Sequence, residues 1–213
     1  MYRFAGVLIL VGFLPSVALA QAEPSDADES ADEPRPCRAA EPQSEWAGQL
    51  RLESVGFGRD AARGAGMGGL GVSLRPRPSP HFAVDLGLDV LGGHDFNAER
   101  RGEVSFTVNP MFFINPRQVV QVYLLTGLGF AGATVEHADQ TKSHYRYVGV
   151  DAGAGLEIRF ARHFAFDLDL VGFLRVRTDP DARDSPEFVD PETGRTSNTS
   201  GGGLARLGLA YYW

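Results

Sequence analysis

The stretch Arg206-Leu207-Gly208-Leu209-Ala210-Tyr211-Tyr212-Trp213 alternates between two kinds of side chain. Leucine and aromatic residues occupy every second position from Leu207 to Trp213. The positions between them carry arginine, glycine, alanine and Tyr212. A period of two residues is that of a β-strand, in which successive side chains point to opposite faces of the sheet. The stretch therefore predicts a strand with one apolar face.

Seven earlier stretches alternate in the same way and are separated by segments typical of turns. They cover residues 46–57, 67–75, 81–91, 103–113, 118–130, 145–160 and 163–177. The connections between the stretches are alternately short and long. Because Pro110 has no amide hydrogen, we expect a bulge or an irregular end in the fourth stretch. Eight alternating runs over this length predict an all-β antiparallel barrel.

Two features indicate that the apolar faces point outward into lipid. Charged residues are nearly absent from these faces, and about ten residues of a tilted strand are enough to cross the hydrocarbon layer. Aromatic residues also collect at the short-turn end, as expected at a membrane interface; this predicted girdle comprises Trp46, Phe82, Phe112, Phe160, Phe164 and Trp213. A secreted lipocalin-type barrel with an apolar interior would not explain the girdle.

In this context the final stretch resembles the closing-strand signal of bacterial outer-membrane barrels, carried here by Arg206, Gly208, Tyr211 and Trp213. With the strand number and the loop asymmetry, it makes residues 46–213 similar to the OmpA/OmpX-type small eight-stranded outer-membrane β-barrel family. The resemblance implies an eight-stranded antiparallel up-and-down transmembrane β-barrel in the bacterial outer membrane, with long loops extracellular. It also implies contact with outer-membrane lipid and lipopolysaccharide, and recognition of the C-terminal strand by the barrel assembly machinery. We expect a monomer.

The polar faces would then line the lumen, and they carry many charges. They hold eight acids and six arginines: Glu53, Asp85, Asp89, Glu103, Asp151, Glu157, Asp167, Asp169, Arg51, Arg75, Arg159, Arg175, Arg177 and Arg206. An eight-stranded barrel leaves little interior space for water. Because an unpaired buried charge costs several kcal/mol, we expect these groups to form an ion-pair network that fills the lumen. Inward glycines would leave room for the long side chains.

A short internal repeat begins two of the stretches. His81-Phe-Ala-Val-Asp-Leu-Gly-Leu recurs as His163-Phe-Ala-Phe-Asp-Leu-Asp-Leu, 82 residues later. This spacing is about the length of two transmembrane hairpins with their loops. Duplication of hairpins and a shared structural constraint are both compatible with the repeat.

The first 44 residues differ in composition from the rest of the chain. Residues 1–20 predict a secretory signal peptide, with Arg3, an apolar middle and an A-x-A site at Ala18-Leu19-Ala20. Residues 21–44 are rich in acids and proline and lack large apolar side chains, which predicts a disordered acidic tail in the periplasm. The barrel would then occupy residues 45–213. Because Cys37 is the single cysteine, no internal disulfide is possible.

The formal net charge of −7 argues against nucleic acid as a partner. The sequence favours a non-enzymatic barrel with a structural or surface-interaction role, and predicts no catalytic residue, cofactor or metal. A narrow pore is one alternative. A lipid A modifying enzyme is another, because Ser143-His144 and His94 lie in long loops, but no Ser–His–acid set has a convincing spacing. The acidic loop between Asp179 and Glu192 lacks the regular spacing of a calcium loop.

Overall fold

The computed structural model describes residues 45–58, 65–95, 98–189 and 196–213. The predicted signal peptide (1–20), the predicted acidic tail (21–44) and Cys37 lie outside these ranges. Within the described ranges, no helix is long and apolar enough to cross a membrane.

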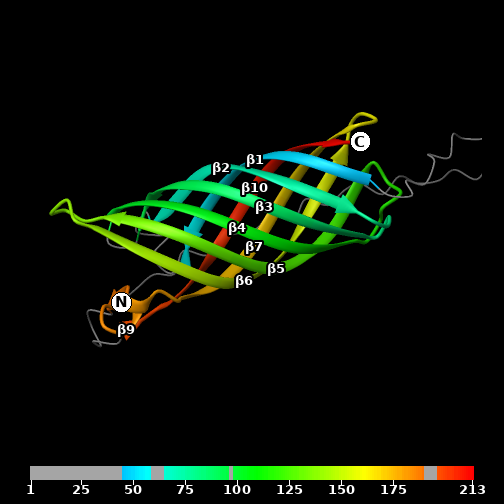
Figure 1. Cartoon of the computed structure of the whole chain (residues 1–213). Coiled ribbons are helices and arrows are strands. Elements are labelled where there is room, and N and C mark those ends of the chain that lie inside the picture. Colours follow the sequence, from blue (N-terminus) through cyan, green and yellow to red (C-terminus); the bar gives the residue numbers. More distant parts are fainter. Residues whose placement is uncertain (1–44, 59–64, 96–97, 190–195) are drawn as a thin grey trace, which may run out of the picture. The chain divides into compact units, whose positions relative to one another are not determined.

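Eight long antiparallel strands close into a barrel (Figure 1). They are β1 (Glu45–Phe57), β2 (Gly66–Arg77), β3 (Phe82–His94), β4 (Arg100–Phe113), β5 (Val120–Glu136), β6 (Lys142–Arg159), β7 (Phe164–Arg177) and β10 (Thr199–Tyr212). Each barrel strand pairs with the next along the chain. Between β7 and β10 lie the 3-10 helix η2 (Pro180–Ala182) and a two-residue hairpin of β8 (Phe188–Val189) and β9 (Thr196–Ser197). The predicted eight-stranded up-and-down barrel is confirmed.

The closing strand β10 joins the two ends of the sheet. It pairs with β1 from Ala47↔Tyr212 to Phe57↔Gly202, and with β7 on its other side. A closed barrel leaves no sheet edge, so every strand satisfies its backbone groups through its neighbours, as a hydrocarbon surrounding requires.

The barrel is apolar outside and charged inside. Leu170 is 67% exposed and Leu50 is 60% exposed, whereas Arg51 is only 2% exposed and Glu157 is fully buried. Exposed leucine, valine and phenylalanine side chains occur on all eight barrel strands. In water so much apolar exposure would be unfavourable, but it is what a barrel surrounded by lipid requires. The predicted sidedness is therefore confirmed.

The β5–β6 hairpin is longer than predicted and extends beyond the other strands (Figure 1). β5 has 17 residues and β6 has 18. Apart from Thr126, their outward side chains are apolar up to the paired Phe130 and Val148. Beyond that pair the outward positions carry Thr134, His144 and Arg146. The prediction ended both strands where apolar alternation fades, but the backbone ladder continues in the polar extension.

Pro110 produces neither the bulge nor the irregular strand end that the sequence predicted. β4 pairs with β5 at Val108↔Leu128 and again at Met111↔Leu125, with the register unchanged. Only the two intervening positions, Asn109 and Pro110, lack a β5 partner. On the other side, Pro110 still pairs with Val84 of β3. The missing amide hydrogen therefore interrupts one ladder locally and leaves the strand in register.

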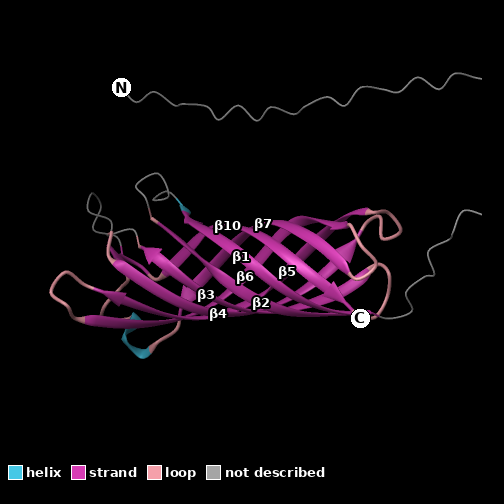
Figure 2. Cartoon of the chain, turned by 90° about the horizontal axis from the view of Figure 1, so that it is seen from above, coloured by secondary structure: helices cyan, strands magenta, loops and turns pink. Residues whose placement is uncertain are grey.

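The two ends of the barrel differ in their connections (Figure 2). Residues 78–81, 114–119 and 160–163 connect the strands at one end. At the other end the connections 58–65 and 178–198 are longer, but 95–99 and 137–141 are as short as the turns, because the strands on either side extend further than predicted. The internal repeat belongs to the short-turn end. The His81 carbonyl accepts a hydrogen bond from the Phe113 amide, and His81 Nδ1 lies 2.9 Å from the Phe113 carbonyl. His163 makes the same two contacts with Tyr212, so each repeat begins with a histidine that joins two hairpins.

Placing a charge on the outer surface tests the sidedness. We expect Leu170→Arg, near the middle of β7, to lower the free energy of unfolding by about 2–4 kcal/mol in lipid vesicles. Leu170→Ala controls for the lost side chain and should have a much smaller effect. Denaturant titration followed by tryptophan fluorescence measures both. Equal midpoints for the arginine and alanine variants would contradict a lipid-facing position.

Candidate functional site

The structure places the charged residues of the predicted lumen network on the inner face of the barrel. Thirteen of the fourteen are buried, and Arg159, at the short-turn rim, is half-buried. Twelve of them form ion pairs with distances of 4.0 Å or less. Asp169 instead accepts a hydrogen bond from the hydroxyl of Tyr123. Asp151 has a buried Oδ1 without a hydrogen-bond partner among the described residues.

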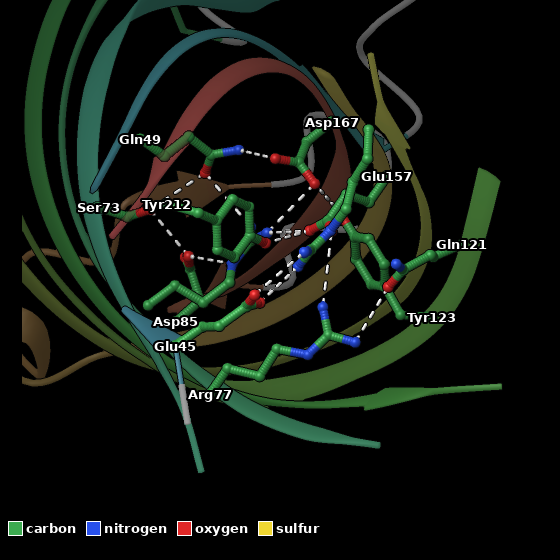
Figure 3. Close-up of polar contacts among 12 residues, drawn as sticks. Glu45, Gln49, Ser73, Arg77, Asp85, Gln121, Tyr123, Glu157, Asp167 and Tyr212 are labelled. Carbon is green, nitrogen blue, oxygen red and sulfur yellow. Dashed lines mark hydrogen bonds and ion pairs between the residues drawn. The ribbon is translucent and has the colours of Figure 1, made fainter. Parts of the chain in front are cut away.

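Arg75 of β2 is the centre of this network, and Figure 3 labels its partners Gln49, Asp85, Glu157 and Asp167. Its Nε donates to Asp85 Oδ1 of β3 at 3.2 Å. Its Nη1 donates to Glu157 of β6 at 3.1 Å and to Asp167 of β7 at 3.2 Å. Its Nη2 lies 3.4 Å from Gln49 Oε1 of β1. One guanidinium group thus links its own strand to four others, and the equivalent aspartates of the two repeats, Asp85 and Asp167, both contact it.

Arg51 forms a second cross-barrel cluster. Its guanidinium binds both oxygens of Asp89 at 2.7 Å and Asp85 at 2.9 Å. Glu53 lies 3.0 Å from Arg51 and accepts a hydrogen bond from Arg206 at 2.9 Å. A side chain at Gly87 would collide with this guanidinium. The glycine therefore provides the space that a buried arginine needs.

The short-turn rim adds further pairs to the network. Arg159 binds Glu45 at 2.8 Å and lies 4.2 Å from the ring centre of Tyr212. Arg77 donates to Gln121 at 3.0 Å, and its guanidinium lies 3.9 Å from the ring centre of Phe113. These contacts close the lumen at the end opposite the long loops.

The described part of the connection between β7 and β10 (178–189 and 196–198) contacts side chains at the other end of the lumen. Glu187 of this loop accepts hydrogen bonds from Arg101 at 2.8 Å and from the hydroxyl of Tyr147 at 2.6 Å. Deeper in the barrel, Arg175 of β7 pairs with Glu103 of β4 at 2.5 Å. Arg177 holds the start of the loop by donating two hydrogen bonds to Asp179. These bonds lower the pKa of the Asp179 carboxyl below its usual value.

The lumen is less uniformly polar than the sequence predicted. Among the described residues, three buried apolar clusters lie inside it: one around Met111 and Phe113, one around Val55, Phe57 and Leu91, and one of Ala47, Ala165, Ala210 and Tyr212. A cavity of about 80 Å³ remains in the outer half, lined in part by Glu53, Asp151, Arg206 and Leu204. Its exposed lining is mainly apolar, and the carboxylate of Asp151 is among the polar groups that reach it.

The predicted girdle residues all lie on the outer surface at the short-turn end. Their exposed fractions run from 40% for Phe82 to 59% for Trp213. Trp213 exchanges backbone hydrogen bonds with Trp46, and its ring lies close to Gly48 of β1. Phe164, Tyr211 and Trp213 form a continuous row of ring contacts. The closing strand therefore brings aromatic side chains from both ends of the sheet together; their role at a membrane interface stays a proposal.

Several members of the network were absent from the sequence-based set. Arg77 and Arg101 lie two positions beyond the predicted stretches, in phase with Arg75 and Glu103, so continued alternation could have identified them. Tyr123 and Tyr212 are also inward-facing, but alternation alone does not reveal that their hydroxyls bind carboxylates. Nothing in the pattern indicates that Glu187 reaches into the barrel mouth.

Ser143 and His144, which the sequence offered as candidates for an enzyme site, point to opposite faces of the β5–β6 hairpin. His144 points outward and contacts Thr134, whereas Ser143 contacts His137 on the inner face of the hairpin. His94 lies at the end of β3 with an exposed side chain. Among the described residues, no cluster of three or more His, Cys, Asp and Glu side chains is arranged to hold a metal ion.

Comparison with known proteins identifies the same architecture. Residues 9–185 match the family model of the outer membrane protein beta-barrel domain. Among solved structures, Neisserial surface protein A is 12% identical, with a TM-score of 0.52, and the match covers 80% of this chain and 97% of that one. No curated protein matches the sequence significantly.

Two further structures give similar values. Ail of Yersinia pestis, solved in complex with the heparin analogue sucrose octasulfate, is 16% identical with a TM-score of 0.51, covering 80% of this chain and 99% of that one. A major outer membrane protein from Thermus thermophilus is 14% identical with a TM-score of 0.51, covering 78% and 99%. At these identities the structural matches show a shared fold alone.

Removing the central arginine tests the network. Arg75→Ala leaves the carboxylates of Asp85, Glu157 and Asp167 buried without their shared partner, so we expect a loss of about 3–5 kcal/mol in unfolding free energy. Arg159→Ala removes an arginine from the half-exposed rim and should cost much less. Denaturant unfolding in lipid vesicles measures both losses. Equal losses of unfolding free energy would show that Arg75 stabilises the barrel no more than a rim arginine does.

Proposed function

The chain belongs to the outer membrane protein beta-barrel domain family, and on that premise we propose that it is a sealed barrel that displays its long loops outside the bacterial cell. The observation that carries the proposal is the occupied lumen. Arg75 and Arg51 each bridge the interior through several carboxylates. Glu187 adds a third closure at the loop end. A hydrated ion would have to break several buried charge pairs to pass.

We base the orientation on the two longest connections, 58–65 and 178–198, which lie at the end opposite the turns 78–81, 114–119 and 160–163. Outer-membrane barrels place short turns in the periplasm and long loops outside the cell. In this orientation the segment before Glu45 extends into the periplasm, and the aromatic girdle lies at the periplasmic interface of the membrane. We propose that the outer apolar belt contacts outer-membrane lipid and lipopolysaccharide, that the β10 strand is recognised by the barrel assembly machinery, and that the barrel is monomeric.

The displayed loops define the surface available to a partner. They are rich in carboxylates: the described part of the β7–β10 loop alone contains Asp179, Asp181, Asp184 and Glu187 against one arginine, Arg183. The structure of Ail contains a heparin analogue, which is polyanionic. The acidic loops favour a neutral or cationic partner for this chain, because like charges repel at an interface.

Conductance measurements separate a sealed barrel from a narrow pore. We expect the folded protein to give no step currents in planar bilayers. The double variant Arg51→Ala/Asp89→Ala removes both members of one buried pair without leaving either unpaired, so it should open a path and produce small reproducible steps. Leu88→Ala, on the outer face of β3, is the matched control and should remain silent.

Steps of constant size from the unmodified protein would contradict the proposal. Heat-modifiable mobility on a gel confirms that each variant is folded before its currents are recorded. A folded double variant that also stays silent would show that the remaining layers seal the lumen without the Arg51 cluster.

A further inference from the structure

Three side chains at the top of the β5–β6 hairpin form a hydrogen-bonded row. His137 Nδ1 lies 2.8 Å from Glu99 Oε2, and His137 Nε2 lies 2.7 Å from Ser143 Oγ. The lumen network does not use any of these three residues. An acid, a histidine and a serine in this order are the elements of a nucleophilic triad, which is recognised by geometry and not by sequence order.

The strand register explains why these residues meet. β4 and β5 pair up to Arg100↔Glu136, so the next position brings Glu99 opposite His137. β5 and β6 pair through Val135↔Ser143, which places Ser143 diagonally next to His137 on the same face. The row therefore crosses three neighbouring strands or their extensions. Glu99 and His137 are 38 residues apart, and only the pairing of β4 with β5 brings them together.

Tight turns hold both ends of the row. In the β3–β4 loop, the Glu99 amide donates to Asp95 Oδ1, and the Asp95 amide donates to the Glu99 carbonyl, each at 3.0 Å. In the hairpin turn, the His137 amide donates to the Thr141 carbonyl at 3.0 Å. Asp139 accepts hydrogen bonds from both the amide and the hydroxyl of Thr141. The acid and the histidine are thus positioned before any substrate arrives.

The row lies well outside the apolar belt. The last apolar outward residue of β5 is Phe130. The seven positions from there to His137, just past the end of β5, rise roughly 20 Å along the strand direction. The side chain of His137 is 30% exposed and that of Glu99 is 23% exposed. Ser143 is half-buried. A substrate would therefore reach the row from the aqueous phase and not from the hydrocarbon layer.

We propose that Glu99, His137 and Ser143 form an extracellular ester-hydrolysing site. Ser143 and His137 are the catalytic residues, and Glu99 is a positioning residue that accepts a hydrogen bond from His137 Nδ1–H and leaves Nε2 free to act as a base. The site goes beyond the sealed-barrel proposal and does not depend on it, because none of its residues belongs to the lumen network.

The reaction needs only an ester and water. Ser143 Oγ bonds to the carbonyl carbon while its proton moves to His137 Nε2. The bond from that carbon to the alcohol oxygen then breaks, and the alcohol leaves with the proton from His137. Water attacks the acyl-serine, giving one proton to His137. The bond between carbon and Ser143 Oγ breaks, the carboxylic acid leaves, and His137 returns its proton to the serine.

The surroundings of the row define the class of substrate. Asp95 and Glu99 from the β3–β4 loop and Asp139 from the hairpin turn surround His137 with negative charge. An anionic ester would be repelled. The position above the belt disfavours long acyl chains buried in lipid, which the lipid A modifying alternative would require. The site therefore suits water-soluble, uncharged esters with a short acyl group.

Covalent labelling tests the nucleophile directly. The folded full chain in detergent micelles is treated with a fluorescent fluorophosphonate, and hydrolysis of p-nitrophenyl acetate is measured in parallel. We expect labelling on Ser143, complete loss of labelling in Ser143→Ala, and a fall in hydrolysis of about 100-fold in His137→Gln. His144→Gln, a histidine on the outer face of the same hairpin, is the matched control and should leave both signals unchanged.

The pH dependence tests the role of Glu99. Its hydrogen bond raises the pKa of His137 above the usual value, and a histidine acts as a base only when it is neutral. Hydrolysis should therefore rise as the pH increases through this raised pKa. Glu99→Gln removes the largest cause of the shift and leaves only the weaker effects of Asp139 and Asp95, so the rate should fall and the midpoint of the profile should move to lower pH.

The outcomes overturn or support the proposal independently of the lumen. Absence of labelling in the folded protein, or labelling that persists in Ser143→Ala, would overturn it. Hydrolysis that is equal in the unmodified chain and the His137→Gln variant would also overturn it. A purely structural role for the row would change heat-modifiable mobility but would produce no labelled serine and no shift in a pH profile.

Discussion

The barrel depends on neutralising charges that its own sequence places inside a hydrocarbon layer. Arg75 is 1% exposed, and it is balanced only because β3, β6 and β7 bring carboxylates to it and β1 brings an amide. A slip of one residue in any of these strands would turn a carboxylate toward lipid and a leucine toward the lumen. The same contacts that satisfy the arginine therefore fix register and closure together.

This constraint also explains the distribution of small and large residues. Long arginines need space within an eight-stranded barrel, and Gly71 and Gly87 lie where a Cβ would collide with the Arg51–Asp89 pair. Aromatic rings complete the packing, since Phe113 and Tyr212 cover the guanidinium groups of Arg77 and Arg159. The interior thus combines charge pairs with apolar contacts, which gives a rigid support for the loops above it.

The fold was accessible from sequence because alternation with period two directly reports which side of a sheet each residue faces. The inward set of charges followed from the same rule. Its two main omissions, Arg77 and Arg101, lie just outside the predicted stretches 67–75 and 103–113, which were too short. Partner choice was not accessible. The stagger between strands decides which carboxylates reach Arg75, and here both Asp85 and Asp167 do. Glu187 reaches Arg101 from a loop that has no regular sequence period. Glu99 and His137 meet for the same reason of stagger.

Because side chains fill the lumen, reactive groups that a ligand can reach lie at the loop end of the barrel. Buried pairs such as Arg51–Asp89 have no access for a ligand and are already matched in charge, so they are poor candidates for binding or catalysis. The β5–β6 hairpin differs, because its ladder continues into water, where polar side chains remain both ordered and reachable. The same strand register that pairs the charges inside the barrel also brings Glu99, His137 and Ser143 into contact at the loop end. A rigid scaffold that carries reactive groups at its rim separates the stability of the barrel from the chemistry of its surface.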